Sequence, residues 1–195
     1  MTQYAPITNA DILPLEVFTE KRTELRQEIV RLKKNRRVSV GPDITFYFEN
    51  RATLLWQIQE MLYIEKGGEE QLKDELQAYN TLVPQKNELV ATMMIEIEDM
   101  DHRRVMLSQL GHIEKHITIL FEGEIVRALS EDDVERTTAE GKTSAVHFLH
   151  FPMTENQAAL FLTTQNEVLL AIEHPRYHYQ TSIPKETLES LRGDL

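Results

Sequence analysis

The most constraining feature of this sequence is the stretch 46–64, which reads FYFENRATLLWQIQEMLYI. Three consecutive aromatic residues favour a strand, and Asn50 is a good helix N-cap because its side chain can accept a bond from a first-turn N–H. The apolar residues that follow recur at helical spacing: Leu54, Ile58, Met61 and Leu62. The Gly67-Gly68 pair is expected to end the helix. The stretch therefore predicts a strand that leads directly into an amphipathic helix.

The predicted helix carries large side chains on two sides. At about 100° per residue, Arg51 projects onto the side of Leu54 and Ile58. The opposite side carries four candidates for a contact with another element: Trp56, Gln59, Glu60 and Tyr63. A helix that packs between a sheet and a second helix would explain both sides. The alternative is a binding surface for a partner, because aromatic residues are enriched in interfaces.

Arg51 needs a partner, because a lone buried charge costs several kcal/mol. We predict that its side chain is largely buried and bonded to a carboxylate or to several backbone carbonyls. Glu49 and Glu60 are the nearest acids along the chain and are the predicted partners. We interpret this pair as structural, orienting the strand–helix junction, and keep a ligand-binding role of the same residues as the alternative.

The second half of the chain alternates between apolar and polar residues. This is clearest over Leu89–Glu98, and period-two alternation is typical of a half-buried strand. The order strand–helix–strand–strand then occurs twice, with the helices opening at Asp101 and Thr154. We predict an α+β fold with a mainly antiparallel sheet built from these two modules. A single domain is expected over 1–195, with helices and a hairpin in 1–87 and the duplicated sheet in 88–195.

The net charge of −11 is unevenly distributed. Residues 20–37 hold eight basic groups against three acidic ones. A globally acidic chain is a poor non-specific binder of nucleic acid. We interpret the basic segment as a solvated helix face whose basic last turn suits the helix dipole. The alternative is that it binds an acidic partner or a phosphate.

The composition excludes several kinds of chemistry. The chain has no cysteine, which excludes disulfides, a thiolate nucleophile and the usual iron–sulfur ligation. The start of the chain lacks the basic and apolar regions of a signal peptide. No apolar run approaches the about 18 residues that a membrane span needs. We therefore expect a cytoplasmic protein without membrane insertion.

Catalytic and metal-binding motifs give no positive signal. The chain lacks a nucleotide-binding glycine loop, a serine nucleophile motif and an H-E-x-x-H sequence. His147 and His150 are three apart in a predicted strand, so they should point to opposite faces and cannot share one ion. Two other pairs lie beside turns and are expected to be ordinary neutral histidines: His112 with His116, and His174 with His178. No catalytic residue, metal or cofactor is predicted.

The chain resembles one bacterial family in seven stretches: LPLEVFTEKR, LKKNRRVSVGP, FENRATLLWQIQEML, AYNTLVP, ELVATMMIEI, KTSAVHFLHFP and EHPRYHY. The family is catalogued as domain of unknown function three thousand five hundred and one, and the likeness extends from Ile12 to Leu195. The resemblance implies no activity and no catalytic residue. It implies a cytosolic accessory protein, often encoded beside a rubrerythrin-like di-iron protein and an iron–sulfur oxidoreductase, in a setting of oxidative stress.

Two functions from different classes follow. The first is a non-catalytic accessory or binding protein for one of those redox partners, since the chain has neither cysteine nor a di-iron motif. The second is a metal- or small-ligand-dependent enzyme with a site at the strand–helix junction, residues 49–60, or near His147. The candidate ligand- or partner-binding residues are Glu49, Arg51, Trp56, Gln59, Glu60 and Tyr63.

Overall fold

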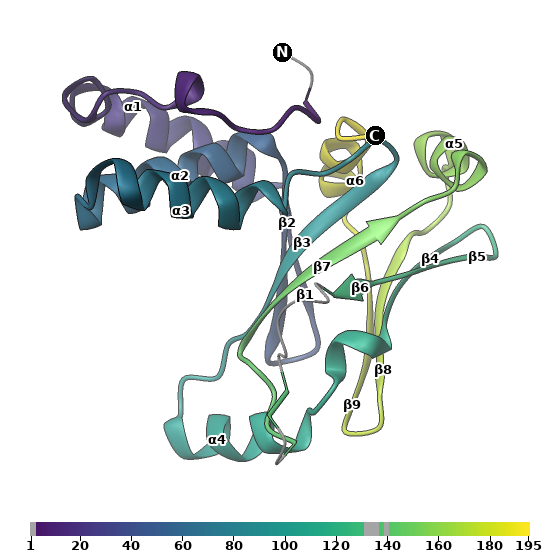
Figure 1. Cartoon of the computed structure of the whole chain (residues 1–195). Coiled ribbons are helices and arrows are strands. Elements are labelled where there is room, and N and C mark those ends of the chain that lie inside the picture. The colour runs from purple at the N-terminus through teal and green to yellow at the C-terminus, as the bar shows by residue number, and fades with distance from the viewer. Residues whose placement is uncertain (1–2, 131–136, 139–140) are drawn as a thin grey trace.

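The strands of the chain form two antiparallel sheets (Figure 1). The computed structural model describes residues 3–130, 137–138 and 141–195. The five-stranded sheet has the order β1 (Arg37–Val40), β2 (Ile44–Glu49), β3 (Glu88–Ile95), β7 (Val146–Pro152) and β6 (Leu129–Ser130). The four-stranded sheet has the order β5 (Glu124–Arg127), β4 (Ile117–Phe121), β8 (Leu169–His174) and β9 (Tyr177–Ser182). The predicted α+β class with antiparallel pairing is confirmed, and the strands divide between two sheets.

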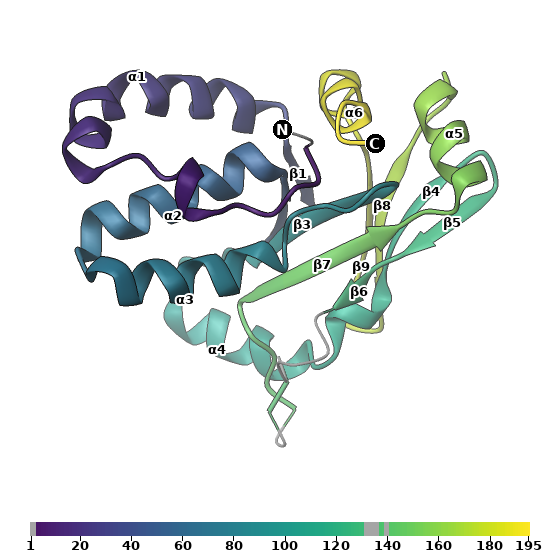
Figure 2. The same cartoon turned by 45° about the horizontal axis from the view of Figure 1, so that its top comes forward.

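The five-stranded sheet is the middle layer of the molecule. Figures 1 and 2 show helices on its outer face and the other sheet on its inner face. The three outer helices are α1 (Leu15–Lys34), α2 (Arg51–Glu65) and α3 (Gly68–Asn80). The other helical segments are η1 (Asn9–Asp11), α4 (Met100–Gln109), η2 (Ile113–His116), α5 (Glu155–Thr163) and α6 (Lys185–Arg192). No helix in the described residues has the length and apolarity needed to cross a membrane.

The repeated strand–helix–strand–strand order is visible in the fold. Each copy places its first strand in the five-stranded sheet and its last two strands, as a hairpin, in the four-stranded sheet. The first strands of the two copies, β3 and β7, pair with each other. The strands β4 and β8 also pair, with Ile117 opposite Ile172. Antiparallel pairing of equivalent strands relates the two copies by an approximate twofold rotation.

The alternation in β3 sets the two faces of the five-stranded sheet. Ala91 and Met93 are buried in the core between the sheets. Val90 points to the outer face and packs with Leu54 and Ile58 of α2 in a second core. Because side chains alternate along a strand, one face of β3 supports the sheet packing and the other receives the helices.

Local capping fixes where the helices begin and end. The side chain of Asn50 accepts from the Thr53 N–H, and the Thr53 hydroxyl accepts from the Asn50 N–H in return. After α2, Lys66 turns the chain with a φ of 55°, just before the Gly-Gly pair. Thr154, where a helix was predicted to open, forms a capping box with Gln157 at the start of α5. The predicted N-cap Asn50 and the helix start at Thr154 are confirmed. The Gly-Gly pair, expected to end α2, instead begins α3, because Lys66 is the C-cap of α2 and Gly67 is the N-cap of α3.

A buried ion pair joins the start of the five-stranded sheet to the end of the chain. Arg36 is 2% exposed and pairs with Asp194. Its guanidinium also donates to the carbonyls of Phe48, at 2.8 Å, and Glu49, at 3.1 Å. The amide of Asn50 donates to the same Asp194 carboxylate at 3.3 Å. The pair therefore holds the strand–helix junction against the turn that follows α6.

Two sequence interpretations are wrong. Arg36 lies in the segment 20–37, which was interpreted as a solvated face, yet its side chain is buried. The reason is its partner near the other end of the chain, which supplies the counter-charge that burial requires. Helix α4 is capped by Asp99, whose carboxylate accepts from a first-turn N–H, and not by Asp101.

The polar stretch Leu129–Lys142 is only partly a loop. Its first two residues form β6, which pairs with β7 and places Leu129 opposite His150. Residues 131–136 and 139–140 lie outside the described residues. A short strand forms at its start because the edge of the five-stranded sheet offers unpaired backbone groups.

Tyr177 of β9 connects the two sheets at the turn between β1 and β2. Its hydroxyl donates to the Val40 carbonyl at 2.8 Å and accepts from the Asp43 N–H at 2.9 Å. Gly41 has a φ of 70°, and a Cβ there would lie 2.6 Å from this hydroxyl. Only glycine suits both the conformation and the close approach. Burial raises the pKa of Tyr177 to about 12.

We expect Arg36→Leu to lower the free energy of unfolding by about 3–5 kcal/mol, because Asp194 would remain buried without its counter-charge. The neighbouring substitution Arg37→Leu is the matched control. The Arg37 side chain is 54% exposed and its pairing with Glu96 should contribute about 0–1 kcal/mol. Urea denaturation measures both variants. Equal losses of stability in the two variants would contradict the assignment of Arg36 as a buried anchor.

Candidate functional site

The strand–helix junction does not gather its charged residues into one cluster. Glu49 bonds to the Thr92 hydroxyl on the outer face of the five-stranded sheet. Arg51 reaches toward the segment before α1, and Glu60 pairs with α1 itself. The predicted acids for Arg51 are therefore wrong, because neither glutamate is the carboxylate that pairs with it. Each of the three charged groups has a different environment.

The carboxylate partner of Arg51 is Asp11. Arg51 Nη2 lies 2.7 Å from Asp11 Oδ1, and the two side chains are 16% and 8% exposed. The guanidinium also donates to the carbonyls of Ala5, at 2.9 Å, and Pro6, at 3.4 Å. The prediction of a largely buried arginine bonded to a carboxylate and to carbonyls is confirmed. The pair fixes the N-terminal segment on the start of α2.

Helix α1 covers three of the residues predicted to face a partner. The Phe18 ring lies 5.6 Å from the Trp56 ring and 5.8 Å from the Tyr63 ring, centroid to centroid. Arg22 bonds to both oxygens of Glu60, at 2.7 and 2.9 Å. The same guanidinium lies 4.7 Å from the Tyr63 centroid, in cation–π geometry. These contacts are those of a helix packed between a sheet and a second helix.

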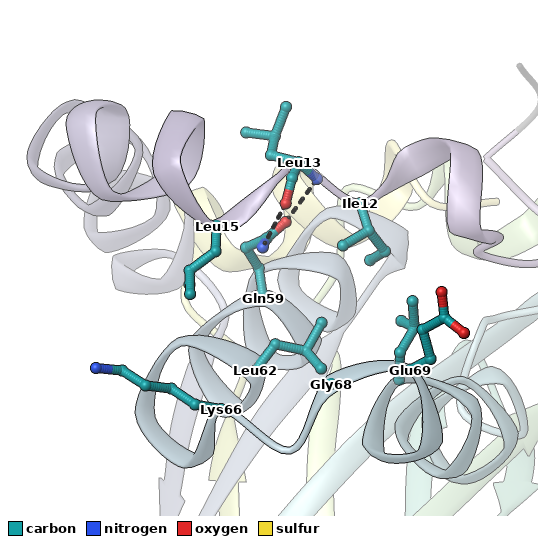
Figure 3. A pocket seen from close by; sticks show the side chains of 9 residues that line it. Ile12, Leu13, Leu15, Gln59, Leu62, Lys66, Gly68 and Glu69 are labelled. Carbon is teal, nitrogen blue, oxygen red and sulfur yellow. Dashed lines mark hydrogen bonds between the residues drawn. The ribbon is translucent and has the colours of Figure 1, made fainter.

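The Gln59 side chain also bonds to another segment of this chain (Figure 3). Its amide exchanges two hydrogen bonds with the backbone of Leu13, at 2.9 and 3.1 Å, and its residue exposure is 4%. Figure 3 shows the amide pointing at Leu13 beside a cavity of about 290 Å³, which Ile12 and Leu62 also line. A buried amide that satisfies a peptide unit holds the segment before α1 in place.

The outer face of the five-stranded sheet carries a larger cavity, which we call the outer cavity. Its volume is about 420 Å³. Its floor comes from three strands, and the helical layer supplies its walls. The residues that carry its chemistry are Lys33, Tyr47, Glu49, Gln57, Tyr79 and Thr92. The apolar part of the floor includes Met94, Val146 and Phe148. The outer cavity thus contains one predicted site residue, Glu49.

Glu49 is held in a fixed orientation inside the outer cavity. One carboxylate oxygen accepts from the Thr92 hydroxyl at 3.0 Å, and the other accepts from the Thr53 hydroxyl. A carboxylate can accept about four hydrogen bonds. Two bonds from hydroxyl groups therefore orient the group and leave acceptor capacity for a ligand.

Two tyrosines in the lining lie in negative surroundings. Burial raises the pKa of Tyr79, and the nearby carboxylates of Glu75, Glu49 and Glu65 raise it further, while a hydrogen bond with Gln57 acts in the opposite direction. Burial also raises the pKa of Tyr47, whose hydroxyl donates to Glu96 at 2.8 Å. Both side chains therefore stay neutral at physiological pH. The Arg37 guanidinium lies over one face of the Tyr47 ring, 5.4 Å from its centroid.

A second cavity, which we call the α1–α2 cavity, has a volume of about 390 Å³. The apolar stripe of α1 lines it with Leu25, Ile29 and Leu32, opposite Trp56. Phe18 is the buried residue of α1, whereas the three stripe residues stay half-buried. Because a surface helix normally buries its apolar stripe, this stripe is incompletely covered.

The histidines of β7 separate as predicted. His147 is fully buried on the inner face, with Nε2 3.0 Å from the Thr143 hydroxyl. His150 lies on the outer face, with Nδ1 3.0 Å from Glu88. The buried Glu114 lies 3.7 Å from the His147 ring. In the part of the chain that the structure describes, no group of three or more His, Asp or Glu side chains could hold a metal ion.

Sequence reasoning missed most of the lining of the outer cavity. Tyr47, Thr92 and Met94 occupy alternate positions of β2 and β3, and this period was the signal that could have placed them on the face of Glu49. Gln57 and Tyr79 gave no comparable signal, because their position depends on how α2 and α3 pack on the sheet.

Comparison with known proteins shows similarity to proteins without an assigned function. Residues 6–195 match the family described as "Protein of unknown function (DUF3501)". A crystal structure described as a novel protein of unknown function from Burkholderia pseudomallei K96243 is 35% identical and superposes with a TM-score of 0.89. The match covers 98% of this chain and 100% of that one. No curated protein matches the chain.

The pair of Arg51 and Asp11 predicts a pH dependence of stability. The bond from Arg51 and the bonds from Thr8 hold the pKa of Asp11 below its ordinary value of 3.8. A carboxyl with a lower pKa in the folded state stabilises that state above the unfolded pKa, and this contribution is lost as pH falls through the folded pKa. We expect Asp11→Asn to lower the melting temperature at neutral pH, and the difference from the parent to shrink below pH 3.8.

Arg51→Leu tests the same pair from its other side. It should lower the melting temperature clearly at neutral pH, because it leaves the Asp11 carboxylate without its guanidinium. Lys33→Ala, at the half-buried end of α1, should change it little. Thermal unfolding measured by circular dichroism compares the variants. A melting temperature of Arg51→Leu equal to that of the parent would exclude a stabilising role of the pair.

Proposed function

We propose that this chain, which belongs to the family of unknown function DUF3501, is a binding protein for a small organic molecule held in the outer cavity. The observation that carries the proposal is the composition of that cavity. Segments distant in sequence bring an oriented carboxylate, an amide and two phenol groups over an apolar floor. An apolar pocket with a few convergent polar groups is the usual form of a small-molecule site.

The volume and the burial of the cavity support this proposal. About 420 Å³ lies within the range of about 300–1,000 Å³ that is typical of ligand sites. Met94, Val146 and Phe148 on its floor are half-buried, so they retain apolar surface that a ligand would remove from water. The carboxylate of Glu49 supplies a fixed acceptor that would orient the ligand.

Val146→Trp tests the site by filling it. A tryptophan at this floor position should occupy the cavity and abolish binding there. We expect a library of small fragments to shift amide resonances of Gln57, Thr92 and Met94 in the parent protein and to leave them unshifted in Val146→Trp. Nuclear magnetic resonance spectroscopy of the isotope-labelled protein measures both.

The matched control is Ile125→Trp, which adds the same side chain at a position of β5 that is 51% exposed. This variant should bind fragments as the parent does. Fragments that shift only resonances outside the outer cavity, or that bind equally well to Val146→Trp, would contradict the proposed site.

A second candidate function is the accessory role that the family resemblance implies. We propose the α1–α2 cavity as the place where a partner protein inserts an apolar side chain beside Trp56. The incompletely covered stripe of Leu25, Ile29 and Leu32 supports this, because exposed apolar grooves mark interaction sites. The proposed partner is a rubrerythrin-like di-iron protein or an iron–sulfur oxidoreductase, in an oxidative-stress response. Its identity rests on the resemblance.

Adjacent residues of α1 provide a test of this second candidate. Ile29→Asp places a charge in the α1–α2 cavity, whereas Val30→Asp places it on a side chain that is 60% exposed. We expect the tagged parent and Val30→Asp to recover the di-iron or iron–sulfur partner from the native host, and Ile29→Asp to lose it while remaining folded. Recovery of neither partner by the parent would contradict the accessory role.

A further inference from the structure

We propose that the outer cavity selects a protonated amine attached to an apolar or aromatic body. This inference deepens the proposed function and rests on it, because it names the chemical class that the same cavity would bind. It follows from three features of the lining: the arrangement of the aromatic rings, the acceptor atoms of Glu49, and the balance of charge around them.

The aromatic rings form two sides of the cavity. Tyr47 and Phe148 stand on either side of Thr92 in the strand register, so one cross-strand row carries both rings. Tyr79 from α3 adds a third ring from the helical layer. Aromatic faces attract cations electrostatically, and rings that surround a bound ammonium group are a common means of recognising it. The apolar body of the ligand would lie on Met94 and Val146.

Glu49 supplies the directional contact. Its two oxygens already accept from the Thr92 and Thr53 hydroxyls, so a ligand gains most by donating hydrogen bonds to the remaining acceptor sites. A charged donor forms a stronger bond with a carboxylate than a neutral donor does. A protonated amine offers both the hydrogens and the charge, whereas a carboxylate or phosphate offers neither.

The charges around the cavity favour a cation. The carboxylates of Glu49, Glu65 and Glu75 help to raise the pKa of Tyr79, and of these Glu49 lines the cavity. Lys33, at the end of α1, also lines it. An anion would have to bind beside the Glu49 carboxylate, with Lys33 as the cationic side chain of the lining. Arg37, beside the lining, lies 5.4 Å from the Tyr47 ring centroid and pairs with Glu96 at 3.5 Å. A cation would therefore be opposed by Lys33 and by a guanidinium that already has a carboxylate partner.

Three phenylalkyl probes of similar size separate the possible charges of the ligand: phenethylamine, which is protonated at neutral pH, 2-phenylethanol and 3-phenylpropionate. Isothermal titration calorimetry or resonance shifts give the affinity of each. We expect phenethylamine to bind at least roughly tenfold more tightly than the alcohol, because the charged bond to Glu49 is added. The acid should bind most weakly.

Variants then assign the preference to particular residues. Glu49→Gln should remove most of the preference for the amine while leaving binding of the alcohol, since the apolar floor is unchanged. Glu173→Gln, on an exposed position of β8, is the control and should change nothing. Tyr79→Phe keeps the ring and should keep the preference, whereas Tyr79→Ala should weaken it. Lys33→Met should strengthen binding of the amine.

Several results would overturn the inference. They are an alcohol or acid that binds as tightly as the amine, a preference that survives Glu49→Gln in a folded protein, or a weaker amine affinity in Lys33→Met. Failure to bind any of the three probes would also overturn it. Fragment shifts that disappear in Val146→Trp would still support a small-molecule site in each of these cases, so the two proposals fail separately.

Discussion

The buried pair of Arg36 and Asp194 is the contact on which the arrangement of the molecule depends. It joins the residue before β1 to the residues after α6. The Arg36 guanidinium also donates to the carbonyls of Phe48 and Glu49. A buried ion pair is stable only when its remaining hydrogen-bonding groups are also satisfied. Here two carbonyls and the Ser190 hydroxyl accept from Arg36, and the Asn50 amide donates to Asp194. This pair fixes the strand–helix junction to the C-terminal residues, and the pair of Arg51 and Asp11 fixes it to the N-terminal segment. Glu49 lies at this junction, and the Thr92 and Thr53 hydroxyls orient its carboxylate in the outer cavity.

Local signals in the sequence were sufficient for most elements of the fold. Asn50 and Thr154 cap the predicted helices because capping involves residues three positions apart. The alternation of β3 placed its residues on the correct faces, because side-chain direction depends only on the strand period. The sequence did not reveal ion pairs between residues that are distant along the chain. Arg36 appeared to belong to a solvated basic segment because its counter-charge lies 158 positions away.

The candidate site shows the same limit more sharply. The sequence placed Glu49, Arg51 and Glu60 together because they are neighbours along the chain, yet Arg51 pairs with Asp11, and Glu60 with Arg22. Both partners belong to the N-terminal segment, whose path over α2 depends on tertiary packing. Of the six predicted site residues, only Glu49 lines the outer cavity, while Trp56 and Gln59 line the α1–α2 cavity. Helical phase identified which side of α2 would be covered, but it could not distinguish cover by α1 from cover by another protein.

The outer cavity exists because the helical layer covers only part of the five-stranded sheet. Leu54 and Ile58 of α2 bury Val90 at one end of the outer face, whereas Met94 and Val146 further along β3 and β7 stay half-buried. In a sheet that needed this face only for stability, a longer helix or larger side chains would have removed the remaining apolar surface from water. Instead the open part of the face carries an oriented carboxylate, which apolar packing does not require. A molecule that binds there would bury this apolar surface and stabilise the folded state. At concentrations well above its dissociation constant, the stabilisation would grow with the logarithm of the ligand concentration. The stability of the molecule and the occupancy of the cavity are therefore coupled through the same few residues of the floor.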